Sequence, residues 1–274
     1  MYNNHFLINN PTGEVLLPDS WFFDFKNMLN SLKNRRTIRQ YANKQIDDAL
    51  LNELLEVAFR ASNTGNMQLY SVVITRDAEM KKKLSPFHFN QPMVEQAPVV
   101  LTFCADLNRF IKWCNQRNAK PGYDNFQTFI TSLIDTTIIA QTFCVAAEEK
   151  GLGICYLGTV TYMTEQIIET LKLPQYVVPV ATITLGYPEV SPKQVERLPV
   201  AGLLHNEVYQ DYSSDDIDRI YAEKEALSTN QAYVHENNKE TLAQVFTDIR
   251  YKKENNEHFS ETFLKAIKKQ GFLK

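Results

Sequence analysis

The chain has 274 residues and a mass of 31.6 kDa, enough for one large domain with its own hydrophobic core. Its 44% hydrophobic and 22% charged residues exclude widespread disorder. A formal charge of -3 excludes a strongly basic protein, so we expect no nucleic-acid partner.

The first part of the chain alternates helical and strand patterns. Residues 1–20 are rich in Asn and Pro and predict an extended N-terminal arm. Apolar residues at spacings of three and four then predict helices over 21–36 and 47–62, the second with Asp47 as its N-cap. A segment rich in β-branched residues predicts a strand over 69–75, and a continuous apolar run predicts a strand covered on both faces over 97–106.

The longest helical pattern covers 126–150. Its middle is apolar nearly all round, which predicts a buried central helix that Gly151 ends. Two more strands (154–160 and 176–188) and three more helices (164–174, 215–227 and 261–272) are predicted after it. Because strands and helices alternate, the class is α/β or α+β, with helices covering a sheet. We expect one domain, with a core over 21–190 and a wrapping C-terminal extension over 191–274.

Several functional classes are disfavoured. The four cysteines form no CxxC pair, so we expect free structural thiols. The five histidines lack metal-ligand spacing and no GxSxG motif occurs, which disfavours a metal centre or a nucleophilic hydrolase. Because no signal peptide and no run of 18 apolar residues is evident, we expect a cytoplasmic protein that does not span a membrane.

Glycine is scarce, with only 9 residues, and neither GxGxxG nor GxxxxGK[ST] occurs. A phosphate ligand would therefore depend on side-chain cations. The densest cationic cluster contains Arg35, Arg36 and Arg39, with Thr37 between them. On extended backbone Arg35, Thr37 and Arg39 would point to one side and suit a phosphomonoester. A solvated basic end of a helix would explain the same residues.

Three other polar clusters could bind a ligand or be ordinary surface loops. The loop over 62–68 offers amides and hydroxyls for a heteroaromatic ring or a sugar chain. Asn90 and Gln91 form a second cluster, and Arg197 stands isolated among prolines. Because oxyanion binders and amides occur without an acid/base pair, the sequence favours chemistry supplied by a cofactor.

Five segments follow one another along the chain: RRTIRQY, SNTGNMQLYSVVIT, NQPMVEQAPVVLTFCADLNRF, GLGICYLG and LGYPEVSPKQVERLP. In this order they resemble the FMN-dependent nitroreductase superfamily, and the resemblance runs from about residue 30 to the C-terminus. The FCADLNRF, RLP and KKQGF segments resemble the branch of the major oxygen-insensitive nitroreductase and the NADPH–flavin oxidoreductases. The resemblance implies an α+β fold with a mostly antiparallel sheet, in an intertwined homodimer. FMN would lie at the subunit interface, and helix 126–150 would be part of that interface.

The resemblance also implies which residues hold FMN. Arg35 and Thr37 would bind its phosphate and ribityl end, with Arg36 beside them and Arg197 as the distal phosphate cation. Arg39 would approach the pyrimidine edge of the ring, where a cation stabilises the reduced flavin.

Further positions would meet the ring or the ribityl chain. The amide of Gln91 would lie near the O2 edge and the substrate side, and the N–H of Gly158 would donate to N5. The other positions implied are Asn63, Gly65 and Gln68, expected to act across the dimer interface, together with Tyr156 and Leu157. No side chain is expected to be catalytic, and no metal is implied.

The chain departs from the pattern of this branch at three positions. Thr159 stands in place of a second glycine, and Val195 stands in place of a phosphate-binding lysine, where Lys193 could assist Arg197. The loop that would meet the 2′-phosphate of NADPH lacks an arginine, for which Lys239 could substitute.

The implied activity is FMN-dependent NAD(P)H oxidation, with NADPH or NADH as the donor. Nitroaromatics, quinones or free flavin would be reduced by a ping-pong hydride-transfer mechanism. Two alternatives stay open: another flavin redox reaction on the same scaffold, such as dehydrogenation or dehalogenation, and a non-catalytic flavin-binding protein.

Overall fold

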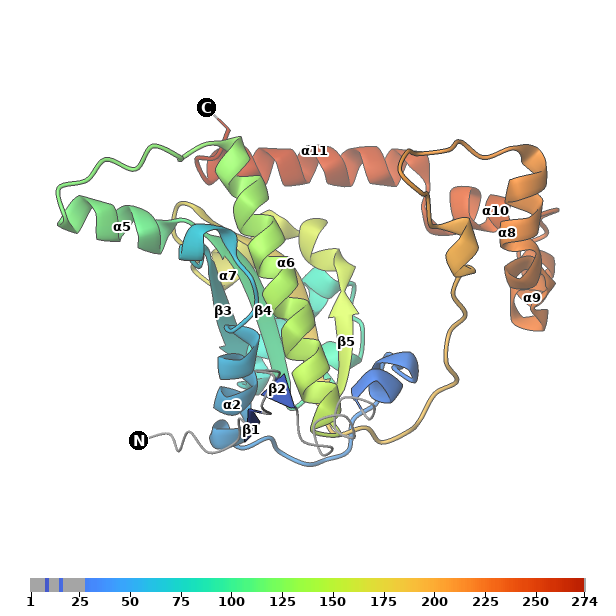
Figure 1. Cartoon of the computed structure of the whole chain (residues 1–274), viewed down its shortest axis with the longest axis horizontal. Coiled ribbons are helices and arrows are strands. Elements are labelled where there is room, and N and C mark those ends of the chain that lie inside the picture. The colour runs from blue at the N-terminus through green and yellow to red at the C-terminus, as the bar shows by residue number, and fades with distance from the viewer. Residues whose placement is uncertain (1–7, 10–14, 17–27, 274) are drawn as a thin grey trace.

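The computed structural model describes residues 8–9, 15–16 and 28–273. At its centre lies a four-stranded sheet in the order β3-β4-β6-β5, with every neighbouring pair antiparallel (Figure 1). These strands are β3 (Tyr70–Thr75), β4 (Val99–Asp106), β5 (Gly153–Leu157) and β6 (Val177–Gly186). A separate hairpin pairs β1 (Ile8–Asn9) with β2 (Val15–Leu16). The predicted α+β class with an antiparallel sheet is confirmed.

Two helices, α2 (Asp48–Ala58) and α6 (Phe126–Glu149), cover one face of the sheet (Figure 1). The ring of Phe143 on α6 lies 5.7 Å from that of Phe103 on β4, between ring centroids, and both side chains are fully buried. The prediction of a long central helix packed into the core is therefore confirmed.

The other face of the sheet is covered as well, which explains the continuous apolar runs. Along β5, Ile154 packs into the cluster beneath α6, whereas Cys155 and Leu157 pack into a second cluster with Leu84. Every residue of β4 and of β6 is buried. Further helices of the core are α3 (Ala78–Leu84), α4 (Met93–Gln96), α5 (Asn108–Gln116) and α7 (Thr164–Thr170). The four cysteines are free and buried, as expected.

Two residues that the sequence predicts at helix ends lie at those ends in the structure. The Asp47 carboxylate accepts the N–H of Leu50 at 2.7 Å, so the predicted N-cap of α2 is confirmed. Gly151 follows α6 with a φ of 74°, a left-handed conformation that glycine adopts at little cost.

Several predicted boundaries are wrong: the helix predicted over 47–62 ends at Ala58, and two other elements also end early. The first predicted helix is described from residue 28 and ends at residue 33, not at 36, because the chain is extended from Arg35. Its residues 21–27 lie outside the described part. The strand predicted over 154–160 ends at Leu157, because Gly158–Thr161 forms a 3-10 turn.

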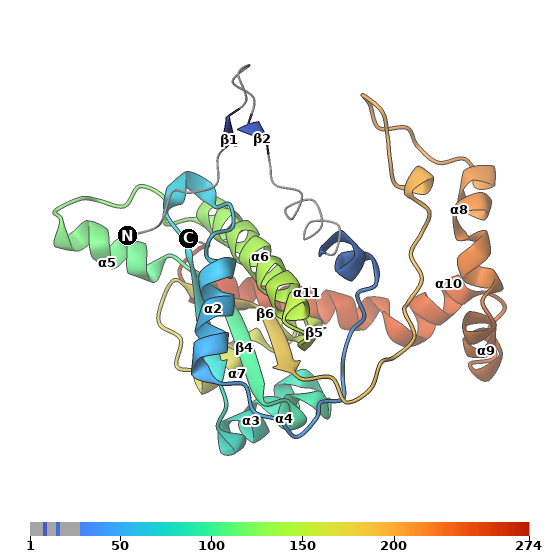
Figure 2. The same cartoon turned by 60° about the horizontal axis from the view of Figure 1, so that its bottom comes forward.

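The C-terminal extension gathers α8 (Ser214–Ala226), α9 (Ser228–Glu236) and α10 (Leu242–Gln244) away from the sheet (Figures 1 and 2). Helix α11 (Lys253–Lys269) then returns to the core and starts earlier than predicted. Phe272, just after it, packs 5.3 Å from Phe129 of α6 between ring centroids.

Helix α6 is long and apolar enough, by length and composition alone, to cross a membrane. A core helix passes the same test, and α6 lies on the sheet (Figure 1). Its outward side also carries apolar residues, since Ile134 and Ile138 are 49% and 38% exposed. Some of the apolar residues of α6 therefore pack into the core, and others lie on an open face, where the sequence predicts a subunit interface.

Candidate functional site

An extended arginine-bearing segment, residues 35–41, lies along the end of the sheet. The N–H of Ile38 donates to the carbonyl of Ile154 on β5 at 3.0 Å. The buried Tyr41 hydroxyl lies 2.7 Å from the Thr184 hydroxyl on β6. The segment is therefore held on two strands, and its side chains are placed by the sheet and not by a helix end.

Two of the few glycines make this close approach possible. A Cβ at Gly153 would stand 2.5 Å from the side chain of Ile38. A Cβ at Gly186 would stand 2.6 Å from the ring of Tyr41. Any other residue at these positions would push the arginine-bearing segment away from the sheet.

Arg35 and Arg36 line a cavity of about 520 Å³ with Glu148 of α6. The Arg35 Nε lies 3.2 Å from a Glu148 carboxylate oxygen. Burial raises the pKa of Glu148, and the charge of Arg35 opposes that rise. The Nε of Arg36 is buried without a hydrogen-bond partner among the described residues, so a donor remains available to a ligand.

The other candidate cations lie outside the lining of this cavity. Arg39 is exposed, and its charge and that of Arg35 oppose the burial that raises the pKa of the Cys155 thiol. Arg197 is exposed and donates to the carbonyls of Val195 and Glu196. The segment that carries Arg197 contacts the arginine-bearing segment, because the side-chain amide of Gln194 donates to the carbonyl of Arg35 at 3.5 Å.

The loop with Gln91 and the turn with Gly158 are joined by a residue that sequence analysis did not select. The Gln91 side-chain amide donates to the His88 carbonyl at 3.0 Å. The Nδ1 of His88 lies 2.8 Å from the hydroxyl of Thr159, next to Gly158. No sequence pattern marks this histidine, because its partner comes from a distant loop.

The turn after β5 leaves its backbone open to a ligand. Gly158 is exposed, and a Cβ built there would meet nothing within 4 Å. Leu157 is buried, so its side chain belongs to the core. Tyr156 is 39% exposed, and burial of its hydroxyl beside Cys144 raises its pKa.

The polar loop over 63–68 is anchored on α6. The buried carboxylate of Asp135 accepts both the N–H and the hydroxyl of Thr64, at 3.0 and 3.1 Å. Gly65 and Gln68 have left-handed backbone, with φ of 56° and 54°, and the N–H of Gln68 donates to the Asn63 side chain at 3.3 Å.

Within one chain, this loop and the arginine-bearing segment are anchored at different places on α6. The loop is fixed to Asp135, whereas Arg35 is paired with Glu148 on the same helix. These anchors are thirteen positions apart, about 20 Å at the rise of an α-helix. The candidate residues Asn63, Gly65 and Gln68 therefore form a half-site of their own.

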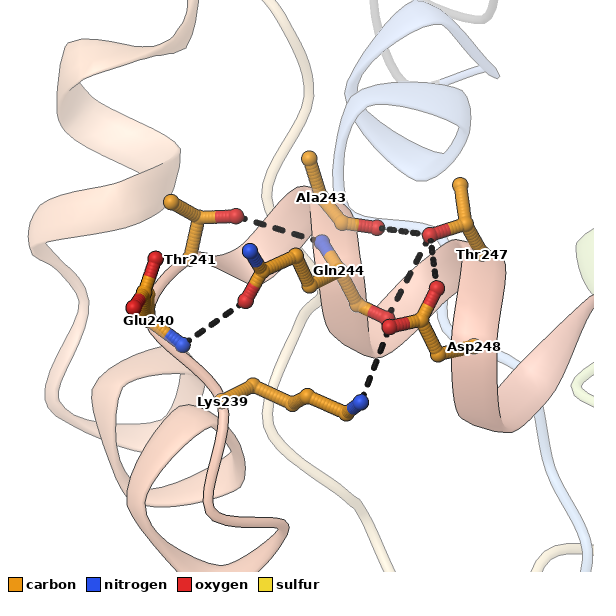
Figure 3. Close-up of polar contacts among 7 residues, drawn as sticks. All are labelled: Lys239, Glu240, Thr241, Ala243, Gln244, Thr247 and Asp248. Atoms are coloured by element: carbon orange, nitrogen blue, oxygen red, sulfur yellow. Dashed lines mark hydrogen bonds and ion pairs between the residues drawn. The ribbon is translucent and has the colours of Figure 1, made fainter.

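Lys239, the cation considered for a 2′-phosphate, already has a partner (Figure 3). Its ammonium lies 2.8 Å from a carboxylate oxygen of Asp248. Hydrogen bonds from Lys239 and from the Thr247 hydroxyl lower the pKa of Asp248, so this carboxylate is ionised near neutral pH.

The donor set fits an FMN phosphate and ring. A buried guanidinium nitrogen of Arg36 lacks a partner in the described structure, and Arg39 and Arg197 add exposed cations. Open backbone at Gly158 and a side-chain amide at Gln91 suit the polar edge of a flat ring.

Comparisons with known proteins show which proteins this chain is similar to. A protein named FMN reductase (NADPH) from Bacillus subtilis (strain 168) is 31% identical over 191 residues, 69% of this chain and 77% of that protein. A crystal structure from Bacteroides fragilis NCTC 9343 is 59% identical with a TM-score of 0.88, over 89% of this chain and 100% of that one.

A second solved structure carries a name and a bound dinucleotide. It is the NADPH:FMN oxidoreductase from Vibrio harveyi complexed with NAD+, with 25% identity and a TM-score of 0.72 over 89% of this chain and 98% of that one. The family model described as "Nitroreductase family" matches residues 32–187, which is more than half of the chain. The chain therefore belongs to the nitroreductase family.

Proposed function

We propose that this protein is an FMN-dependent NAD(P)H oxidoreductase that reduces nitroaromatics, quinones or free flavin. The observation that carries the proposal is the arginine-bearing segment held beside β5, the strand that ends at the open Gly158 backbone. Relatives named FMN reductase (NADPH) and NADPH:FMN oxidoreductase support it. Bound FMN would supply the redox chemistry, taking a hydride from NADH or NADPH and passing electrons to the acceptor.

The chain's own residues would bind and orient the cofactor. Arg35, Arg36 and Thr37 would hold the phosphate end, helped by Arg197, because guanidinium groups bind phosphate oxygens through paired hydrogen bonds. Arg39 would place its charge at the pyrimidine edge. In this role the cations do what a glycine-rich loop does elsewhere.

The ring-contacting groups would be backbone and amide. Gly158 would offer its N–H, flanked by Tyr156 and Leu157, and Gln91 would offer its side-chain amide. None of these groups needs to exchange a proton, so water can deliver the protons that the acceptor takes up.

We further propose a cytoplasmic homodimer in which each FMN site is built from two chains. The loop with Asn63, Gly65 and Gln68 is anchored on α6 about 20 Å along the helix from the anchor of Arg35, so it would serve the partner's site. The open apolar side of α6 and the exposed apolar residues Val200 and Leu203 support such an interface. The extension over 191–274 would wrap the partner.

Steady-state kinetics test the proposed activity. FMN-loaded protein, separated from unbound flavin, should oxidise NADH or NADPH much faster once a nitrofuran or quinone is added, with parallel double-reciprocal lines for donor and acceptor. Protein that binds FMN but does not oxidise either donor would instead be a flavin-binding protein.

Replacing Arg39 with alanine should lower the reduction potential of bound FMN. The reduced ring carries negative charge at its pyrimidine edge, and Arg39 would stabilise that charge. If Arg39→Ala weakens the binding of reduced FMN tenfold relative to oxidised FMN, the potential falls by about 30 mV for a two-electron couple. Potentials measured against a reference dye check this result, with the exposed Arg60→Ala as a control. An unchanged potential in the Arg39 variant would contradict the role.

The protein should discriminate weakly between NADH and NADPH. Lys239 is neutralised by Asp248, so it adds little attraction for an extra phosphate. Asp248→Asn should free the ammonium and raise the NADPH/NADH ratio of kcat/KM about fivefold. Asp218→Asn, an exposed change on α8, is the matched control. Equal ratios in the wild type and in D248N would show that Lys239 does not meet the donor.

A further inference from the structure

One polar contact ties together two loops of the proposed flavin site. The Nδ1 of His88 lies 2.8 Å from the Thr159 hydroxyl. The histidine is fully buried, and Thr159 is only 8% exposed. Because little water reaches the pair, the contact is not in competition with solvent and can fix the spacing of the two loops.

Each partner is directly joined to a group assigned to the flavin. On one side, the His88 carbonyl accepts the side-chain amide of Gln91 at 3.0 Å. On the other side, Thr159 follows Gly158, whose backbone is open. A displacement of the histidine would therefore move both the amide and the N–H that face the ring.

The loop needs such a tie because its backbone is unfavourable. Phe89 and Asn90 follow His88 with φ of 55° and 53°, so two consecutive non-glycine residues are left-handed. This conformation persists only when the surroundings hold it. The contact to Thr159 is one such restraint, at the residue that enters the left-handed stretch.

The chemical state of the ring suits a neutral hydrogen bond. Burial lowers the pKa of His88 to about 4, so the imidazole is uncharged near neutral pH. A neutral ring can share one hydrogen bond with a hydroxyl whichever nitrogen carries the proton. Its Nε2 is buried and makes no hydrogen bond to the described residues, which leaves Thr159 as the side chain that orients the ring.

We propose that His88 is a positioning residue that, through Thr159, holds the Gln91 loop and the Gly158 turn at the spacing that bound FMN requires. This inference rests on the proposed function, since it assumes that both loops meet the flavin. His88 itself touches neither cofactor nor substrate.

Two pairs of variants test the contact. His88→Ala and Thr159→Val remove one partner each, whereas His88→Asn and Thr159→Ser keep a polar group at the same reach. The first pair should weaken FMN binding about tenfold, as expected when a buried hydrogen-bonding group loses its partner. The second pair should bind FMN within about threefold of the wild type, because the contact can re-form. Fluorescence titration of the apoprotein with FMN measures both.

The double variant His88→Ala/Thr159→Val separates positioning from general damage. If the two residues act as one unit, it should lose no more FMN affinity than either single variant. Thr102→Val, which changes a fully buried hydroxyl on β4 that makes no hydrogen bond to the described residues, is the control and should leave FMN affinity unchanged. The visible spectrum of bound FMN should change in the first pair and not in the second.

Three results would overturn the inference. They are unchanged FMN affinity in both His88→Ala and Thr159→Val, losses that add in the double variant, and no recovery in His88→Asn and Thr159→Ser. A wild-type protein that binds no FMN would instead overturn the proposed function, so the two failures are distinguishable.

Discussion

Gly153→Ala should destabilise the protein and weaken FMN binding together. The new methyl group would stand 2.5 Å from Ile38, closer than packed carbons approach, and Ile38 lies between Thr37 and Arg39. Overpacking of a buried site costs about 1–3 kcal/mol of unfolding free energy. Relief of the clash would shift the arginine-bearing segment, so FMN affinity should fall by about tenfold or more.

Urea denaturation of the apoprotein and FMN titration check this prediction. Gly122→Ala is the matched control, because a Cβ at Gly122 meets nothing within 4 Å. The account is contradicted if Gly153→Ala is as stable as the control and binds FMN with wild-type affinity.

Arg35→Ala should remove a phosphate cation and leave Glu148 unpaired. The two side chains are 24% and 13% exposed, so the pair is mostly shielded from water. Loss of the partner should cost about 1–3 kcal/mol of unfolding free energy at neutral pH, less than for a fully buried pair. FMN affinity should fall as well, since a carboxylate would then face the phosphate without a counter-charge.

The pH dependence of this variant has a defined sign. Burial raises the pKa of Glu148, and Arg35 opposes the rise, so Arg35→Ala raises that pKa further. A carboxyl with a raised pKa destabilises the folded state when it is ionised, and this cost appears as the pH rises through the folded pKa. The stability difference from the wild type should therefore be largest at neutral pH and shrink in mild acid.

The double variant Arg35→Ala/Glu148→Gln tests the cause. It removes the uncompensated charge, so it should recover the stability lost at neutral pH without recovering FMN affinity. Equal instability of the single and double variants across this pH range would show that Glu148 is not the source of the cost.

The elements that sequence analysis located were those with strong local patterns. Strands β4 and β6 could be predicted because each is a mostly apolar stretch of strand length, and α6 because its pattern continues over many turns. Helix α9 was missed because its polar sequence, STNQAYVHE, has no apolar stripe and no buried residue. Local periodicity thus predicts elements that contribute a face to the core.

The site was only partly predictable, for a related reason. Arg35, Arg36 and Arg39 could be selected because they are neighbours in the sequence. The pairing of Arg35 with Glu148 and the contact of His88 with Thr159 join residues far apart in the chain, and no periodicity reports such contacts. The packing role of Gly153 could not be predicted from the sequence either. This glycine is needed for the close approach of Ile38 and not for a phosphate loop.

Anaerobic titration of the FMN-loaded protein with NADH or NADPH tests the central claim most directly. The account predicts that a stoichiometric amount of donor bleaches the flavin absorbance, and that a nitroaromatic or quinone added afterwards restores it. Flavin that stays oxidised with both donors, in protein that binds FMN tightly, would contradict it.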